Sequence, residues 1–506
     1  MKIAYNSKSA DFTGGRVALL FLLFGFAIFQ LINSGFPAFA IVCIIPVIIL
    51  AAILTLSKGM NVFWILLIVN YILQWHSLPP LPVPMSIPNE MLEVLLLAMA
   101  AIDVKEARFE RAANLMMFCL LVWAAFIFIE VFNDSCGLGL QVGAWFSGAR
   151  MMAFQLIYAH LVYILYIKDP KTLIKYLYFW GALSLFAAFW IWKQQKFGLT
   201  ASENSFIQGR GRSTHIINGG TTIRLFSVYG DAANFGIGIA STAVSFLIFA
   251  ITTKIKKHKY YFLIVGLACV WAMFPSGTRT ATFCLFAGFA FYVILSKSFK
   301  IAVPVGIAFV FIYIILAFTT IGNGNASIRR MRSGFSKNDA SANQRTINQA
   351  VMKKYLADAP FGLGVGIGYE NVPANNKFRI LATIAPDSEY VFIWIHSGYV
   401  GITVFLICTF FIIVGASRIV LFRLRSPSLQ GIGAGLTCSF VAIQLGGYGN
   451  QVLMQFPNCL LFYGGVSLVF ILPKIEDEWL KYEEEQLAIQ TEKERLKEEK
   501  KRASRV

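Results

Sequence analysis

Charged residues are scarce in this chain. Asp, Glu, Lys and Arg together make up 14% of its 506 residues, whereas a soluble domain carries roughly 25%. Hydrophobic residues make up 57% of the sequence, and the mean hydropathy is +0.65. This composition excludes a soluble globular protein.

Metal-binding and haem-binding patterns are also missing. The 8 cysteines include no CxxC pair and no Cys/His spacing typical of zinc or haem. Three candidate acids, Asp134, Asp231 and Asp387, come from separate segments. We therefore predict no metal site and no cofactor. Most cysteines lie inside or at the edge of apolar runs, where they behave as small apolar side chains: Cys43, Cys119, Cys269, Cys284, Cys408, Cys438 and Cys459.

Long apolar runs are abundant, whereas the strand-like alternation of an outer-membrane barrel is absent. Runs of about 17 to 20 residues can cross a hydrocarbon core of about 30 Å as helices. We predict an all-α, polytopic transmembrane bundle. Its roughly fourteen spans lie near residues 17–35, 37–56, 60–78, 90–103, 114–133, 151–168, 173–192, 232–252, 260–275, 280–296, 301–320, 388–415, 429–447 and 457–473. The short span 90–103 begins with Glu90 and Glu93, so a re-entrant segment is its alternative.

Basic loops give the orientation of these spans. With fourteen spans, all of the basic loops fall on the same side as both termini, which the positive-inside rule places in the cytoplasm. The net charge of +18 therefore does not indicate a nucleic-acid partner. The first apolar run follows Arg16 without a small-residue cleavage site, so we expect it to be retained. The basic loops are Lys105–Arg111, Lys168–Lys175, Lys254–Lys259, Lys297–Lys300 and Arg418–Arg425.

Two large loops are predicted on the opposite side, at residues 193–231 and 321–387. Loops of this length are uncommon and often functional. The same side carries a proline-rich segment at 79–89 and a segment at 134–150 that resembles an interfacial one. The Glu/Lys-rich end, 475–506, is predicted to be a charged cytoplasmic helix. Its role is to solubilise the chain end or to contact a partner or anionic lipid.

Several arginines lie on the side that the positive-inside rule disfavours: Arg210, Arg212 and Arg224 in the first large loop, Arg329, Arg330, Arg332, Arg345 and Arg379 in the second, and Arg279 in a short turn. A guanidinium at a membrane boundary costs free energy unless it is paired or lines a wet cavity. The planar guanidinium group can donate two parallel hydrogen bonds to phosphate oxygens. We interpret these residues as a binding site for a phosphate-bearing ligand. The alternative for Arg279 is a snorkelling or helix-capping side chain.

Three local patterns follow one another in this half of the chain. They are Arg224-Leu-Phe-Ser-Val-Tyr-Gly-Asp-Ala-Ala-Asn-Phe-Gly236, then Ser276-Gly-Thr-Arg-Thr-Ala281, then Arg345 with the glycine run 361–368 and the segment 386–401. In this order they resemble the O-antigen polymerase and ligase superfamily of bacterial envelope glycosyltransferases. The resemblance covers roughly residues 195–405.

This resemblance implies a reaction on undecaprenyl-diphosphate-linked glycans at the periplasmic face of the bacterial inner membrane. A sugar hydroxyl attacks the anomeric carbon of the donor and the lipid diphosphate departs, so neither nucleotide nor metal is required. The implied diphosphate ligands are Arg224, Arg279, Arg345 and Arg210, and the implied base is Asp387 or Glu389. His396, Tyr390 and His215 are possible supporting residues.

Departures from the family pattern bear on the choice of reaction. Gly277 and Thr278 separate Ser276 from Arg279, and Asp387 stands where ligases commonly carry His. The Asp in place of this His favours a polymerase of O-antigen or exopolysaccharide repeat units. The alternative is a ligase that transfers polysaccharide to lipid A-core or another acceptor. Expected partners are the lipid-linked glycan, membrane lipid and a chain-length regulator or other assembly protein, but no nucleic acid.

Each candidate also has a purely structural interpretation. Asp231 and Asn234 can cap a helix, and Asp387 and Glu389 can complement the positive end of another. Tyr390 can anchor at the interface. His396 can be a packed, hydrogen-bonded side chain, and His215 can be a surface residue. A transporter would instead show internal repeats and charged or broken helices at the midplane, and we find no convincing repeat.

Overall fold

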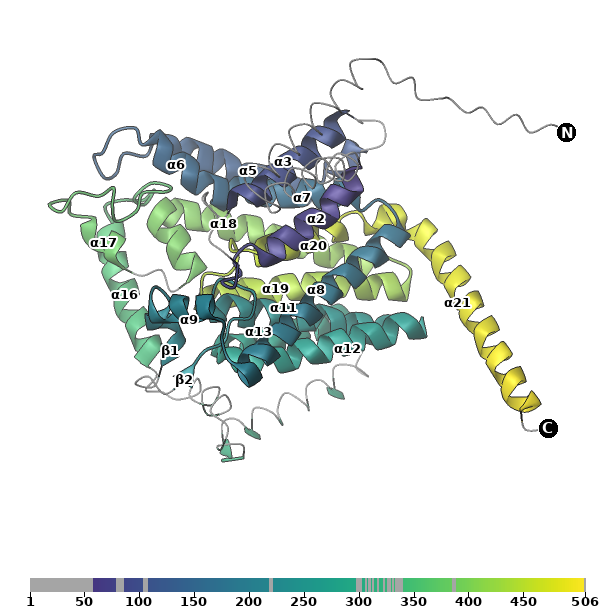
Figure 1. The fold of residues 1–506 in the computed structure, drawn as a ribbon. Helices are drawn as coiled ribbons and strands as arrows, with labels where there is room; N and C mark the ends of the chain where they lie inside the picture. Colours follow the sequence, from purple (N-terminus) through teal and green to yellow (C-terminus); the bar gives the residue numbers. More distant parts are fainter. Residues whose placement is uncertain are drawn as a thin grey trace, which may run out of the picture. The chain divides into compact units, whose positions relative to one another are not determined.

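The computed structural model describes residues 58–78, 86–102, 108–217, 222–296, 340–384 and 388–504, with isolated positions from 303 to 332. The chain divides into two units, Met1–Val62 and Phe63–Val506. The description that follows concerns the second unit, which is a bundle of helices (Figure 1).

Eight helices in the described ranges are long and apolar enough to cross a membrane, so the chain is a multi-pass membrane protein. They are α5 with η2 (Leu115–Phe132), α6 to α7 (Val142–Tyr166), α8 (Pro170–Phe197), α11 (Ala232–Thr252), α12 with η5 (Lys256–Ser276), α13 (Arg279–Ser296), α18 (Glu389–Phe422) and α19 (Pro427–Gly449). A ninth candidate is a pair bent by 79°, Cys459–Val469 (η6 and α20) followed by α21 (Leu472–Ala503).

The predicted count of about fourteen spans is not confirmed. Two expected spans correspond to shorter helices, α2 (Gly59–Ile72) and α3 (Ser86–Ile102). Spans 17–35 and 37–56 lie outside the described residues, and 301–320 lies largely outside them. The segment 134–150 is not a separate interfacial piece, because its second half forms the start of the span Val142–Tyr166.

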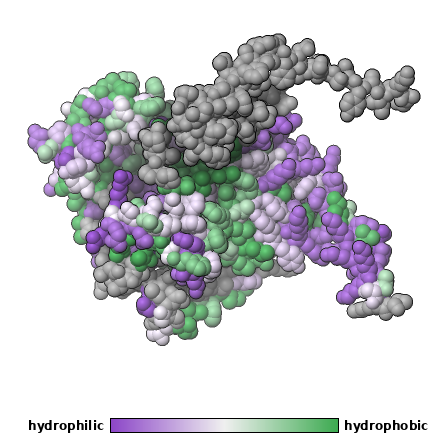
Figure 2. Space-filling view, in the orientation of Figure 1, coloured by the Kyte–Doolittle hydropathy of each residue, from purple (hydrophilic) through white to green (hydrophobic). Residues whose placement is uncertain are grey.

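Small residues bring α11 and α19 together at the centre of the bundle. A Cβ on Gly435 would lie 2.4 Å from Phe249, and one on Gly446 would lie 2.4 Å from Ile237. Close backbone approach through small residues is the usual way in which membrane helices pack. Large apolar side chains such as Phe118, Phe410 and Phe422 are exposed instead. Figure 2 shows hydrophobic surface over the bundle and mostly hydrophilic surface on α21.

The first predicted loop, 193–231, contains regular structure. Helix α8 continues to Phe197, and α9 (Ala201–Gln208) and α10 (Arg212–His215) follow it. Strands β1 (Ile216–Ile217) and β2 (Thr222–Ile223) then form an antiparallel pair. This hairpin leads into the start of α11, where Asp231 accepts hydrogen bonds from the amides of Ala233 and Asn234. The capping interpretation of Asp231 is therefore confirmed.

The second predicted loop contains α16 (Ala340–Leu356), α17 (Arg379–Thr383) and the glycine run. Gly398 has φ 62° and interrupts the helical geometry of α18, which leaves two carbonyl groups without partners in their own helix. The amides of Leu363 and Gly364 donate to the carbonyls of Ile395 and His396 at 2.9 and 3.1 Å. The glycine run thus attaches this loop to the break in α18.

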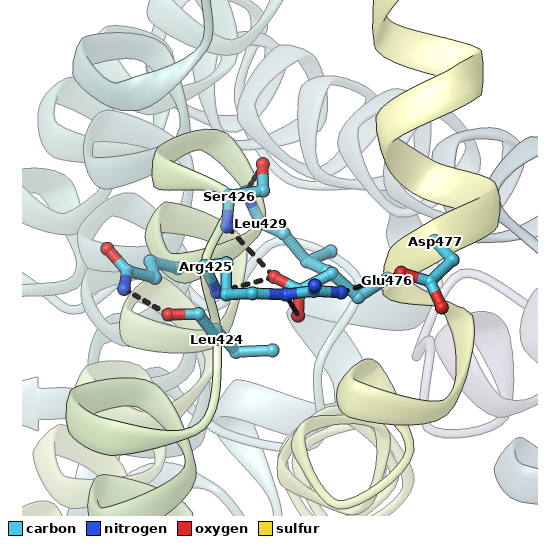
Figure 3. A network of polar contacts seen from close by, with 7 residues as sticks. Leu424, Arg425, Ser426, Leu429, Glu476 and Asp477 are labelled. Atoms are coloured by element: carbon cyan, nitrogen blue, oxygen red, sulfur yellow. Dashed lines mark hydrogen bonds and ion pairs between the residues drawn. The ribbon is translucent and has the colours of Figure 1, made fainter.

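Helix α21 is tied to the turn between α18 and α19 (Figure 3). The buried carboxylate of Glu476 accepts hydrogen bonds from the amides of Arg425 and Ser426 at 2.6 and 2.8 Å. The Arg425 guanidinium also contacts Glu476 at 3.3 Å and Asp477 at 2.6 Å. These carboxylates raise the pKa of Arg425, Asp477 being the main cause. The 475–506 segment is thus a helix with a fixed attachment at its start.

Candidate functional site

Arg224 connects the hairpin to the turn before α13. Its guanidinium donates to the carbonyls of Ser276 at 3.2 Å and Thr214 at 3.0 Å, and to the hydroxyl of Thr278 at 2.9 Å. Burial lowers the pKa of Arg224; Asp231 opposes this shift, whereas the nearby charge of Arg279 adds to it. The side chain is thus held in one orientation beside a second cation.

Arg279 follows the turn formed by Ser276, Gly277 and Thr278. Gly277 has φ 58°, a left-handed conformation that glycine adopts without strain. The Ser276 hydroxyl donates to the carbonyl of Met273 and accepts from the amide of Thr278. The two residues that separate Ser276 from Arg279 therefore form a defined turn, and Thr278 is the residue that contacts Arg224.

Arg345 reaches the same place from α16. Its guanidinium donates to the carbonyl of Gly449 at 2.7 Å. Gly449 packs against Thr280, whose hydroxyl would lie 2.5 Å from a Cβ at that position. The charges of Arg345 and Arg279 also act on each other. The Nε of Arg345 is buried and has no hydrogen-bond partner within the described part of the chain.

Three arginines from separate segments thus meet at one end of the bundle, near the start of α13 and the end of α19. Like charges brought together in this way repel one another, and burial increases the cost. Neither Arg224 nor Arg345 forms an ion pair with a described carboxylate. The group, which we call the arginine cluster (Arg224, Arg279 and Arg345), is therefore suited to an anionic ligand.

The remaining charged candidates occupy different environments. Arg210 is exposed in the turn between α9 and α10. Asp387 lies outside the described residues. Glu389 is 2% exposed, and its carboxylate accepts hydrogen bonds from the amides of Val452 and Leu453, both at 2.9 Å. Through these bonds, Glu389 holds the backbone that follows α19 against the start of α18.

Tyr390 and His396 make internal contacts. The Tyr390 hydroxyl donates to the carbonyl of Gln444 at 2.9 Å, which connects α18 to α19. The Nδ1 of His396 lies 3.2 Å from the carbonyl of Gly364, and its ring packs edge-on against Phe392. Tyr390 thus joins α18 to α19, and His396 joins α18 to the glycine run.

The surface interpretation of His215 is wrong, because the side chain is only 1% exposed. Its Nε2 accepts a hydrogen bond from the amide of Ala232 at 3.2 Å, and its Nδ1 lies 3.1 Å from the carbonyl of Gly211. The ring also packs edge-on against Phe206 and Phe226. Burial lowers the pKa of His215 to about 4, so the neutral ring helps to fix the start of α11.

Glu203 is a structural residue that the sequence did not single out. Its buried carboxylate accepts hydrogen bonds from the side chains of Ser77, Trp190 and Gln194. Burial raises the pKa of Glu203, but these bonds and one from the Thr200 amide outweigh burial and hold it below its ordinary value. The Thr-x-x-Glu spacing signals a capping box at the start of α9, but no local pattern reveals the contacts with Ser77 and Trp190.

No group of three or more His, Cys, Asp or Glu residues in the described ranges could hold a metal ion. A family model described as O-antigen ligase matches residues 262–406. No curated protein matches the chain. The matched stretch includes Arg279, Arg345 and the glycine run. The match confirms the resemblance found in the sequence, and it places residues 262–406 in the superfamily of O-antigen polymerases and ligases.

Proposed function

We propose that this protein is a metal-independent glycosyltransferase that polymerises undecaprenyl-diphosphate-linked oligosaccharide repeat units into O-antigen or exopolysaccharide. The family match supports a role in O-antigen assembly. The observation that carries the proposal is the meeting of Arg224, Arg279 and Arg345 at one end of the bundle. We place this end at the periplasmic face of the inner membrane and both termini in the cytoplasm.

The arginine cluster fits the charge that develops in such a reaction. When the acceptor hydroxyl attacks the anomeric carbon, the bond to the lipid diphosphate breaks and its oxygens gain negative charge. Fixed guanidinium groups stabilise this charge without having to reorganise. Among the described residues the Nε of Arg345 has no hydrogen-bond partner, so we propose that it donates to a diphosphate oxygen. Arg210, in the adjacent turn, is a further candidate for the glycan or the diphosphate.

Asp387 is the proposed general base, which accepts the proton of the acceptor hydroxyl. It immediately precedes Ser388, the residue before α18, so it belongs to the segment that also carries Glu389. Glu389 is less suited to this role because two backbone amides already donate to its carboxylate. We therefore assign the base to Asp387 rather than Glu389.

The test compares Arg279→Ala and Arg345→Ala with Arg212→Ala, an exposed arginine on α10. Purified full-length protein is given lipid-linked repeat units, and glycan length is measured. We expect each cluster variant to lower the elongation rate by roughly a hundredfold, with the thermal unfolding temperature little changed. Arg212→Ala should elongate as the wild type does. Full activity in both cluster variants would refute the diphosphate role.

A ligase is the second candidate, favoured by the description of the matched family model. The two activities use similar donors and differ in the acceptor. A ladder of lipid-linked glycans would identify a polymerase, whereas glycan on lipid A-core or another new acceptor would identify a ligase. Co-purification with a chain-length regulator would add support for the polymerase.

A further inference from the structure

A cavity of about 1170 Å³ lies between α8, α12 and α21. Five residues at the start of α12 line it, whereas the turn that carries Ser276 and leads to Arg279 follows the end of that helix. The five residues are Lys256, Lys257, His258, Tyr260 and Tyr261. A span of this length rises about 30 Å, the thickness of the hydrocarbon core. The cavity therefore lies at the bilayer face opposite the arginine cluster, far from the proposed reaction.

One wall of the cavity is apolar. Phe179 and Ala182 from α8 line it, together with Trp64 and Tyr261. Aromatic and small apolar side chains at the end of membrane-spanning helices match the acyl region of a lipid near its glycerol backbone. A small hydrophilic ion alone would not bury such a surface.

The mouth of the cavity is cationic. Lys175, Lys493 and Lys497 line it, and none of them forms an ion pair with a described carboxylate. A fourth lysine, Lys256, is paired with Glu494 at 3.0 Å. Lys257 lies over the ring of Tyr178, with its Nζ 5.9 Å from the ring centre. The mouth therefore carries a surplus of positive charge next to an apolar wall.

The geometry of α21 supports a position at the membrane surface. The helix is bent by 79° from the segment that precedes it, so it does not continue the direction of that segment. Tyr482, Ile489, Lys493 and Lys497 all line the cavity, and their spacing puts them on one face of α21. Lysines near apolar side chains on such a face typically reach toward lipid headgroups. Figure 1 shows α21 leaving the bundle on the side away from α16 and α17.

We propose that this cavity binds one anionic phospholipid, with its phosphate among Lys175, Lys493 and Lys497 and its acyl chains against Phe179, Ala182 and Trp64. The apolar wall favours a lipid over a free phosphate ion, and the surplus of lysine favours an anionic over a zwitterionic headgroup. The bound lipid would fasten α21 to α8 and α12. This site is independent of the proposed glycan chemistry.

The experiment uses the full-length protein in detergent, titrated with phosphatidylglycerol or phosphatidylcholine and followed by native mass spectrometry and thermal unfolding. The cavity variant combines Lys175→Gln, Lys493→Gln and Lys497→Gln. The control variant combines Lys500→Gln, Lys501→Gln and Arg502→Gln. The second set removes the same number of charges, all of them from α21 beyond the cavity, whereas Lys175 of the first set lies on α8. We expect wild type and control to bind phosphatidylglycerol equally, and the cavity variant to bind it at least tenfold more weakly. Phosphatidylcholine should stabilise none of them.

Two further experiments distinguish a phospholipid from a free phosphate ion as the ligand. Ala182→Trp fills the apolar wall without changing charge, and it should weaken lipid binding while the protein remains folded. Inorganic phosphate should not compete with the lipid at millimolar concentration. Equal loss of binding in the control set would refute a defined site, as would equal binding of phosphatidylcholine. Effective competition by phosphate would show that the cavity binds the ion and not the lipid.

Discussion

At the scale of single residues, two neighbouring acids are predicted to act in different ways. Glu389 receives hydrogen bonds from two backbone amides and is buried, whereas Asp387 precedes the helix and is the proposed base. Glu389→Ala leaves those amides without partners, so we expect a loss of about 2 to 5 kcal/mol in unfolding free energy. Asp387→Asn should keep the wild-type unfolding temperature and lower turnover by about a hundredfold or more.

Thermal unfolding and elongation assays on both variants test whether Glu389 is structural and Asp387 is catalytic. Wild-type turnover by Asp387→Asn across the whole pH range would exclude Asp387 as the base. An unchanged unfolding temperature in Glu389→Ala would show that its two hydrogen bonds are dispensable.

His215 predicts a pH dependence of stability. Its pKa in the folded protein is about 4, below the ordinary value of 6.5, so the folded state disfavours the protonated ring. The stabilisation is fully present above pH 6.5 and is lost as the pH falls from about 6.5 to about 4. The maximum loss is about 3 kcal/mol.

The measurement is the unfolding temperature of wild type and His215→Asn over this pH range. The variant has no ring to titrate, so its unfolding temperature should fall less steeply on acidification. Identical pH profiles would show that His215 is not the group responsible.

At the scale of elements, the break in α18 holds the second large loop in place. Gly398 has φ 62°, and a Cβ there would lie 2.0 Å from the carbonyl oxygen of Pro360. Gly398→Ala should therefore lower stability by roughly 2 to 4 kcal/mol and detach the loop that carries Arg345. Gly368→Ala is the matched control, because its Cβ would meet only Asn371, at 3.7 Å.

Limited proteolysis of residues 340–384, with unfolding temperature, provides the readout. We expect faster cleavage in Gly398→Ala than in Gly368→Ala, and a lower elongation rate. Equal cleavage of both variants would mean that the break in α18 does not secure the loop.

At the scale of the whole molecule, the two ends of the bundle carry different chemistry. The arginine cluster lies at one end, and the lysine-rimmed cavity with α21 lies at the other. If the arginine end is periplasmic, an alkaline phosphatase fusion after Val506 should be inactive and a green fluorescent protein fusion there should be bright. The opposite pattern would invert the orientation and contradict the proposed periplasmic reaction.

The sequence alone predicted the spans that the structure describes, because helices in a bilayer must bury an apolar run of fixed length. It also predicted the charged C-terminal helix. The sequence predicts that one span starts near residue 151, whereas the helix begins at Val142. The prediction is wrong at this end because residues 142–150 have few of the large apolar side chains that mark a span.

Only the tertiary structure decided which polar residues have structural partners. Glu389 pairs with amides 63 and 64 residues away, and Arg345 with a carbonyl 104 residues away. The local sequence does not show that His215 is buried, because its partner, the start of α11, lies 17 residues further along the chain. Local sequence specifies hydropathy and helix ends, whereas the partner of a buried polar group depends on how distant helices pack.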